Sequence, residues 1–300
     1  MGWRRTWEAR SMPEARLAVN KTYKLYVGGA FPRSESGRSY LVTSHGGRGL
    51  ANAALASRKD LRDAVVAARK AQPGWAGATA YNRGQVLYRV AEMLEGRHAQ
   101  FVGALADCEG LSVGAASAAV DASVDRLVWY AGWSDKVAQV VGSSNPVAGP
   151  YFDFSVPEPM GVVGILAPPS SSLLGLVGVL APVIITGNTA VVVASEARPL
   201  PALDLAEVLA TSDVPAGVVN ILTGRSVELA PVLAAHRDVD ALDLAGAAQE
   251  LEKSLEEAAA GNVKRVLRRA RSGADWSAEP GPERMLFFVE TKTVWHPIGV

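Results

Sequence analysis

The chain has 300 residues, 49% of them hydrophobic and 20% charged, which is typical of a globular protein with one large domain or two modest ones. Thirty basic and thirty acidic residues give a formal net charge of zero, so no overall field favours nucleic acid or an anionic membrane as a partner. The single cysteine, Cys108, excludes an internal disulfide and a multi-cysteine metal site and favours a reducing compartment, so we expect a cytoplasmic protein.

The four histidines and the first residues of the chain narrow the function further. His45, His98, His236 and His296 lie far apart and lack the i, i+4 spacing of a zinc-binding helix, so we expect no metal site. Residues 1–20 contain arginines and glutamates but no apolar run, which argues against a secretory signal. We interpret this segment as a linker or tail.

The first half of the chain after this segment is predicted to be mainly helical. Residues 21–31 alternate apolar and polar positions and favour a strand that turns at Gly28 and Gly29, followed by surface loops up to residue 50. Ser57 and Asp60 have the spacing of a capping box, so a helix should begin there and end at Pro73 and Gly74. Three more helices are expected, one from Thr79, one around Phe101 and one over 118–137.

Residues 161–196 carry no charged side chain until Glu196. A run this long raises the possibility of a membrane span, but prolines, serines and a Gly-Asn pair divide it into three pieces that are each too short. The pieces predict a strand at 162–167, an apolar helix and a second strand at 190–194. Ser171 or Ser172 should cap the helix, and Gly187 should end it. This is the pattern of a βαβ crossover.

Strands and helices continue to alternate after the crossover. Strands are expected at 218–222, 239–244 and 263–267, and helices around Leu203, at 227–236 and at 247–260. This alternation predicts an α/β domain with a mainly parallel, Rossmann-like sheet. Two further segments, 147–156 and 285–295, have strand character, and the second, near the end of the chain, must pair with another strand.

Three arginines, Arg268, Arg269 and Arg271, form a short basic cluster after the last expected core strand. A cluster of this size is usually a solvated surface, and the neutral net charge argues against nucleic acid as a partner.

Several of these segments, in this order, resemble the aldehyde dehydrogenase superfamily: KLYVGGAF, EPMGVVGILAP, APVIITGNTAVVVASEARPL, VPAGVVNILTG, HRDVDALDLAG and VETKTVW. The similarity covers about residues 21–266 and resumes in the last dozen residues. It is greatest to the C-terminal, truncated unit of family 16 aldehyde dehydrogenases. The resemblance implies a cofactor domain at 21–139 and 161–267, oligomerisation strands at 140–160 and 285–300, and a connection at 268–284 in place of the catalytic domain.

The resemblance also implies that the catalytic groups of the family are missing or altered. Aldehyde oxidation requires a thiolate nucleophile, an oxyanion donor and a base. No cysteine follows Cys108, and the block with the family's glutamate base has no counterpart after Arg265. Ser170 occupies the position of the oxyanion-holding asparagine, and Pro169 precedes it. Whether the chain is an enzyme therefore stays open, with the missing groups arguing against it.

The cofactor positions of the family are only partly kept. Glu196, Gly224 and Gly246 match the family, and they are either NAD contacts or ordinary turn and surface positions. The departures are Val193 for the ribose-binding lysine, Ser226 and Leu251 for glycines and Ala247 for a serine. Because Ala and Leu supply neither the donor nor the close backbone approach that a pyrophosphate needs, we expect no cofactor, with NAD as the possible exception.

Three functions remain in view. The first is a non-catalytic module that associates with a homologous aldehyde dehydrogenase unit or forms a homo-oligomer, without nucleic acid or membrane as a partner. The second is an NAD-dependent aldehyde dehydrogenase, and the third is an NAD-binding domain without catalysis.

Overall fold

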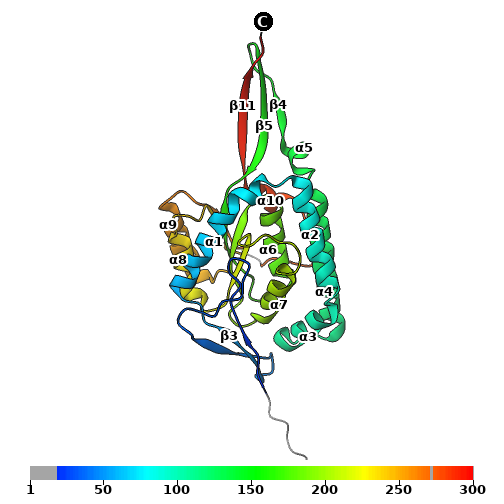
Figure 1. Ribbon diagram of the computed structural model, residues 1–300, viewed down its shortest axis with the longest axis vertical. Helices are drawn as coiled ribbons and strands as arrows, with labels where there is room; N and C mark the ends of the chain where they lie inside the picture. Colours follow the sequence, from blue (N-terminus) through cyan, green and yellow to red (C-terminus); the bar gives the residue numbers. More distant parts are fainter. Residues whose placement is uncertain (1–18, 271–272, 300) are drawn as a thin grey trace, which may run out of the picture.

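The structure is a computed structural model that describes residues 19–270 and 273–299 (Figure 1). Residues 1–18 of the expected linker lie outside the described part, as does Arg271 of the expected basic cluster.

A five-stranded, fully parallel sheet forms the centre of the molecule, with the strand order β10-β9-β6-β7-β8. Its strands are β6 (Val162–Leu166), β7 (Thr189–Val193), β8 (Val219–Leu222), β9 (Ala241–Asp243) and β10 (Arg265–Leu267). Every residue of β6 and β7 is buried, as expected for strands with helices on both faces. The predicted α/β fold with a parallel sheet is confirmed.

Two helical layers cover the sheet, on the two sides seen in Figure 1. One layer contains α1 (Arg58–Gly77), α8 (Ser226–Ala235) and α9 (Gln249–Ala260). The other contains α2 (Ala80–Glu95), α3 (His98–Glu109), α4 (Val113–Trp133), α6 (Leu174–Ile185) and α7 (Leu200–Leu209). Because side chains alternate along a strand, Val191 and Val193 of β7 pack in the first layer's core and Ala190 and Val192 in the second's.

The βαβ crossover from β6 through α6 to β7 is present, and every residue of α6 is buried. Gly187, with φ of 92°, follows the helix, in a left-handed conformation that glycine adopts without a Cβ clash. The prediction that Ser171 or Ser172 is the N-cap of α6 is wrong, because Leu173 holds the N-cap position. The Ser171 hydroxyl oxygen instead accepts a hydrogen bond from the Gly175 N–H at 2.9 Å, and the Ser172 N–H donates to the Glu109 carboxylate. Among the described helices, none is both long and apolar enough to cross a membrane.

For helix α1, the predicted start is confirmed and the predicted end is wrong. The Ser57 and Asp60 capping box is present, but the helix continues past Pro73 to Gly77. Trp75 lies in this last turn, is buried and donates from its indole nitrogen to the Ile184 carbonyl at 2.8 Å. Tertiary packing thus carries the helix through a proline that sequence reasoning treated as its end. Helix α4 starts and ends earlier than the predicted 118–137, and α5 (Val137–Val141) follows it.

A small sheet has the order β1-β3-β2, and its strand β2 and the start of β3 lie where surface loops were expected up to residue 50. Its strands are β1 (Thr22–Tyr23), β2 (Ser39–Thr43) and β3 (Gly49–Ala54). The strand predicted over 21–31 is reduced to β1 and two bridges, of which Tyr26 pairs with Ile221 at the outer edge of β8. The Gly- and Ala-rich β3 lacks the β-branched residues that usually signal a strand.

A third sheet projects from the body, and the C-terminal end of the described chain lies near its tip (Figure 1). It consists of β4 (Ser143–Asn145), β5 (Tyr151–Pro159) and β11 (Val289–Pro297), antiparallel in the order β11-β5-β4. The last expected strand is wrong at 285–287, which belong to α10 (Glu283–Phe287). Met285 is fully buried in the main core, so packing rather than β-propensity determines its conformation.

Candidate functional site

The candidate cofactor residues follow the carboxyl ends of neighbouring strands. Ser170 follows β6, Glu196 follows β7, Gly224 follows β8 and Gly246 follows β9. In open parallel sheets this edge is where ligands bind. The structure therefore brings the predicted positions to the same edge of the sheet.

The carboxylate of Glu196 lies at the N-terminus of α8. Its Oε2 accepts a hydrogen bond from the Ser226 N–H at 3.2 Å, and its carbonyl accepts one from the Tyr40 hydroxyl at 3.2 Å. Burial is the main cause that raises the pKa of Tyr40, so this hydroxyl stays protonated as a donor. Glu228 adds a second carboxylate in the first turn of α8. A diphosphate at this helix end would have to displace one carboxylate and approach another.

Packing alone accounts for both glycines that match the family. Gly224 has φ of 151°, a conformation that disfavours other residues, and a Cβ there would lie 3.2 Å from the Ala56 nitrogen. A Cβ on Gly246 would collide with the carbonyl oxygen of Ala167, because the Gly246 N–H bonds the Leu166 carbonyl at 2.8 Å. The turns therefore need glycine whether or not a cofactor binds.

Three departures from the family pattern, Val193, Ala247 and Leu251, place apolar side chains at this edge. Val193 and Ala247 are buried in the core between the sheet and α1, α8 and α9, and Leu251 packs against the same core. None of these side chains carries a hydrogen-bond donor. Glu250 and Glu252 lie in the first turn of α9, so this second helix end is also negatively charged. Both helix ends are thus poorly suited to a diphosphate.

Ser170 and Cys108 bear on whether catalysis can occur. Ser170 is exposed, next to the exposed Pro169. Cys108 lies on α3 and is buried in a small core with Leu200 and Leu203 of α7. Burial, assisted by Asp107, raises the pKa of the Cys108 thiol to about 12, so it is a neutral thiol at physiological pH rather than a nucleophile. Its environment is that of a small buried hydrophobe.

Within the described residues, no group of three or more His, Cys, Asp or Glu side chains is placed to hold a metal ion.

Sequence reasoning missed a buried ion pair at the same edge of the sheet. Asp243 ends β9, is fully buried, and its carboxylate pairs with the guanidinium of Arg284 in α10. Burial raises the pKa of Asp243, and Arg284 and the Ala245 N–H, at 3.0 Å, oppose that rise. An aspartate at the end of an apolar strand was the available signal, but its partner lies 41 positions away in the chain.

Comparisons with known proteins agree with this architecture. The family model described as aldehyde dehydrogenase family matches residues 32–270. Retinal dehydrogenase 2 of Gallus gallus is 33% identical over 264 residues, which are 85% of this chain and 49% of that protein. Cytosolic 10-formyltetrahydrofolate dehydrogenase of Mus musculus is 31% identical over 263 residues, which are 84% of this chain and 28% of that protein.

Solved structures give the same result. PnpE of Pseudomonas sp. WBC-3 superposes with a TM-score of 0.78 at 28% identity, covering 82% of this chain and 50% of that one. The NAD+ complex of an aldehyde dehydrogenase from Bacillus cereus superposes with a TM-score of 0.77 at 26% identity, again over 82% and 50%. The chain thus spans about half the length of most of these relatives, and residues 268–288, which join β10 to β11, contain only α10 as regular structure in their described part. A family match over more than half of the chain, with the parallel sheet and its crossover in place, means that this chain belongs to the aldehyde dehydrogenase family.

Proposed function

We propose that this chain is a non-catalytic, aldehyde-dehydrogenase-like module that associates with a complete aldehyde dehydrogenase unit or with a second copy of itself. The observation that carries the proposal is the projecting sheet of β4, β5 and β11. A three-stranded sheet that stands away from the body leaves most residues of its strands exposed or partly exposed, which is costly for an isolated protein and useful in an assembly.

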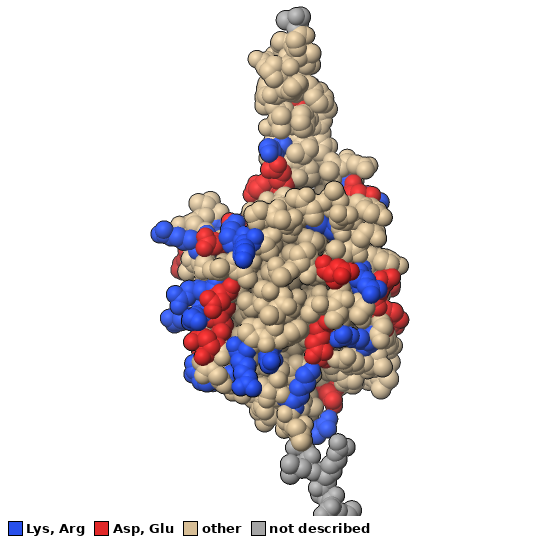
Figure 2. Space-filling view, in the orientation of Figure 1, with Lys and Arg blue, Asp and Glu red and all other residues tan. Residues whose placement is uncertain are grey.

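The surface of this sheet supports an interface. Tyr151, Phe152 and Trp295 are 42%, 49% and 58% exposed, and Tyr151 packs edge-on against Trp295 at 5.7 Å between ring centroids. Figure 2 shows few charged side chains on the visible face of the projection, and the Lys292–Glu158 pair, at 2.8 Å, neutralises two of the charges on its strands. Exposed aromatic side chains with few charges are typical of the buried centre of an interface.

The free edges of the sheet are a second feature that favours association. In the described chain, β11 and β4 each pair with β5 on one side and with no strand on the other. β11 is nine residues long and carries threonine, valine and tryptophan, which favour a strand. Such an edge can accept another strand.

The lack of catalytic groups supports the non-catalytic part of the proposal. Cys108 is buried and protonated, and the short connection between β10 and β11 carries no cysteine. The resemblance to the truncated unit of family 16 aldehyde dehydrogenases makes a complete dehydrogenase unit the favoured partner.

Co-purification with a complete homologous dehydrogenase unit, followed by light scattering after size exclusion, tests the proposal. The wild-type chain should elute as an assembly, and the double substitution Tyr151→Ser and Trp295→Ser should weaken it. Tyr88→Ser is the matched control, because Tyr88 is also about half exposed but lies on α2. A chain that stays monomeric both alone and with the dehydrogenase unit would rule the proposal out.

NAD binding without catalysis is a second candidate, supported by NAD+-complexed structures among the similar proteins. The strand ends keep the position of a cofactor site, but Glu196 and Glu228 at α8 oppose a diphosphate. Calorimetric titration with NAD decides between the two. Affinity weaker than about 1 mM would exclude a physiological role. NADH production from an aldehyde by the pure chain would instead establish the enzyme, and we expect none.

A further inference from the structure

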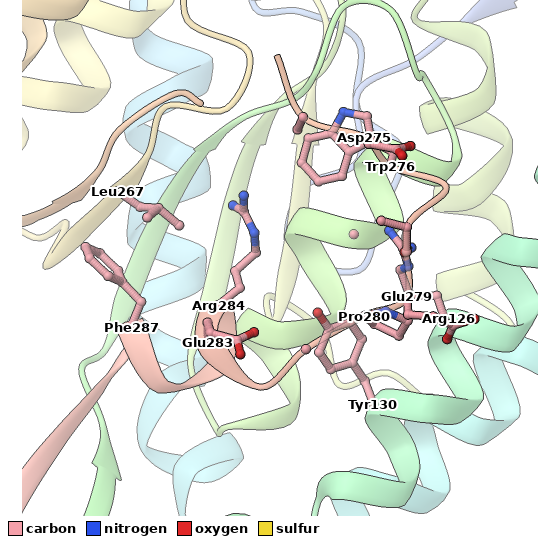
Figure 3. Close-up of a pocket in the computed structure, with 14 residues that line it drawn as sticks. Arg126, Tyr130, Leu267, Asp275, Trp276, Glu279, Pro280, Glu283, Arg284 and Phe287 are labelled. Carbon is pink, nitrogen blue, oxygen red and sulfur yellow. The ribbon is translucent and has the colours of Figure 1, made fainter. Parts of the chain in front are cut away.

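A pocket of about 400 Å³ lies between α4, α6 and residues 274–287 (Figure 3). Its size is within the range of small-molecule sites. The wall formed by residues 274–287 lies outside the 32–270 segment that the family model matches. The pocket is therefore partly built from sequence that this chain does not share with the family model.

The walls of the pocket are aromatic. In Figure 3 the Trp276 ring lies on one side and the Tyr130 ring on the other, with Arg126 and Arg284 on the remaining sides. Trp276 approaches α6 closely because residue 178 is glycine; a Cβ there would lie 2.9 Å from the indole. The Arg284 guanidinium lies 5.5 Å from the centroid of the Trp276 ring. A flat apolar group fits against such walls.

Arg126 places a buried positive charge at the pocket. It is 8% exposed, and in the described part of the chain no carboxylate lies within ion-pair distance of it. Among the described residues, its guanidinium donates from Nη2 to the Ala278 carbonyl at 2.7 Å, and its other N–H groups donate to no protein atom there. Arg284 is different, because Asp243 neutralises it. The carboxylates that act on Arg126, Glu279 and Asp275, are exposed and lie beyond ion-pair distance, so the buried guanidinium can still pair with an incoming carboxylate.

The rim of the pocket carries the opposite charge. Asp275, Glu279 and Glu283 line it and are exposed. Asp275 accepts bonds from the N–H and hydroxyl of Ser277, whereas Glu279 and Glu283 make no ion pair within the described chain. The pocket is thus positive where it is deep and negative where it opens.

We propose that this pocket binds a small zwitterion of the amino-acid class, with its carboxylate at Arg126, its ammonium at the rim carboxylates Glu279 and Glu283, and an apolar side chain against Trp276. The site is independent of the projecting sheet and of the strand ends discussed above. Its failure would leave the association proposal untouched, and the reverse also holds.

Three matched probes test the assignment by calorimetric titration of the full chain: phenylalanine, 3-phenylpropanoate without the ammonium, and phenethylamine without the carboxylate. Phenylalanine should bind tightest. Phenethylamine should bind at least about tenfold more weakly, since it loses a charged hydrogen bond to a buried group. 3-Phenylpropanoate should bind about threefold more weakly, as expected for loss of an exposed ion pair.

Two substitutions locate the charges. Arg126→Gln keeps a donor for the Ala278 carbonyl and should weaken phenylalanine and 3-phenylpropanoate about tenfold while leaving phenethylamine unchanged. Glu279→Gln should weaken phenylalanine and phenethylamine about threefold and leave 3-phenylpropanoate unchanged or tighter. Arg225→Gln is the control and should leave all three affinities unchanged, because Arg225 is exposed and lies at the start of α8, away from the pocket.

If none of the three probes binds, the proposal is overturned. A preference for phenethylamine over phenylalanine, or an Arg126→Gln variant with wild-type affinities, would also overturn it. If Arg126→Gln does not fold, the exposed Glu279→Gln substitution decides the question alone, because it should weaken phenethylamine and should not weaken 3-phenylpropanoate.

Discussion

The ion pair between Asp243 and Arg284 should be the most sensitive polar contact at the carboxyl edge of the sheet. Arg284→Met removes the guanidinium and keeps most of the apolar volume, while Asp243 stays fully buried with the Ala245 N–H as its remaining partner. The carboxyl then either stays charged without a counter-ion or takes up a proton. Protonation limits the cost, because it turns the group into a neutral acid.

The largest loss of stability that the unpaired carboxyl can cause follows from the ordinary pKa of an aspartate, 3.8. Protonating such a group at neutral pH costs about 4 kcal/mol, and at about pH 5 it costs about 2 kcal/mol. In the Arg284→Met variant the pKa of Asp243 is far higher in the folded state than in the unfolded state. The variant therefore shows none of this pH-dependent loss below pH 3.8, and its stability falls as the pH rises above that value. Loss of the Trp276 contact adds a pH-independent loss of about 0.5–1 kcal/mol.

Urea unfolding followed by circular dichroism, at several pH values, measures both the pH-dependent and the pH-independent loss of stability. The added substitution Asp243→Asn in the Arg284→Met background should recover most of the pH-dependent loss, since an amide needs no counter-ion. Arg225→Met on the surface is the control and should cost less than about 0.5 kcal/mol. A loss at Arg284→Met that is small, independent of pH or not recovered by Asp243→Asn would refute the reasoning.

Three further predictions concern other parts of the fold. Burial raises the pKa of Asp204 to about 6, so ionisation of this carboxyl above that pH costs the folded state up to about 3 kcal/mol. The variant Asp204→Asn, whose amide oxygen can still accept from the Tyr23 hydroxyl, should therefore be more stable than the wild type above pH 6 and not below pH 3.8. A stability difference that does not depend on pH would contradict this. Gly246→Ala should lower the unfolding midpoint through its clash with Ala167, with no dependence on NAD; an unchanged midpoint would contradict the packing explanation. Cys108 should resist iodoacetamide in the native chain and react after denaturation, as mass spectrometry can show; fast native labelling would contradict its burial.

The candidate site could be predicted in position but not in chemistry. The sequence identified Ser170, Glu196, Gly224 and Gly246 as family positions and predicted the strands that precede them, and the observed strand order brings these residues to one edge. The sequence did not indicate that Glu196 bonds the start of α8, because that contact depends on the angle at which the chain leaves β7. The pocket at Arg126 was likewise invisible, since its walls come from segments about 150 residues apart.

The sequence by itself determined the elements whose signals are local. Ser57 and Asp60 form their capping box because both partners lie within one helical turn, and 162–166 and 189–193 form buried strands because valine-rich runs suit a sheet covered on both faces. Only the tertiary structure decided that α1 continues past Pro73, where Trp75 gains a buried contact, and that Met285 joins a helix rather than the last strand. In both cases burial against distant residues outweighs a local preference, and the same long-range packing creates the Asp243–Arg284 pair and the pocket beside it.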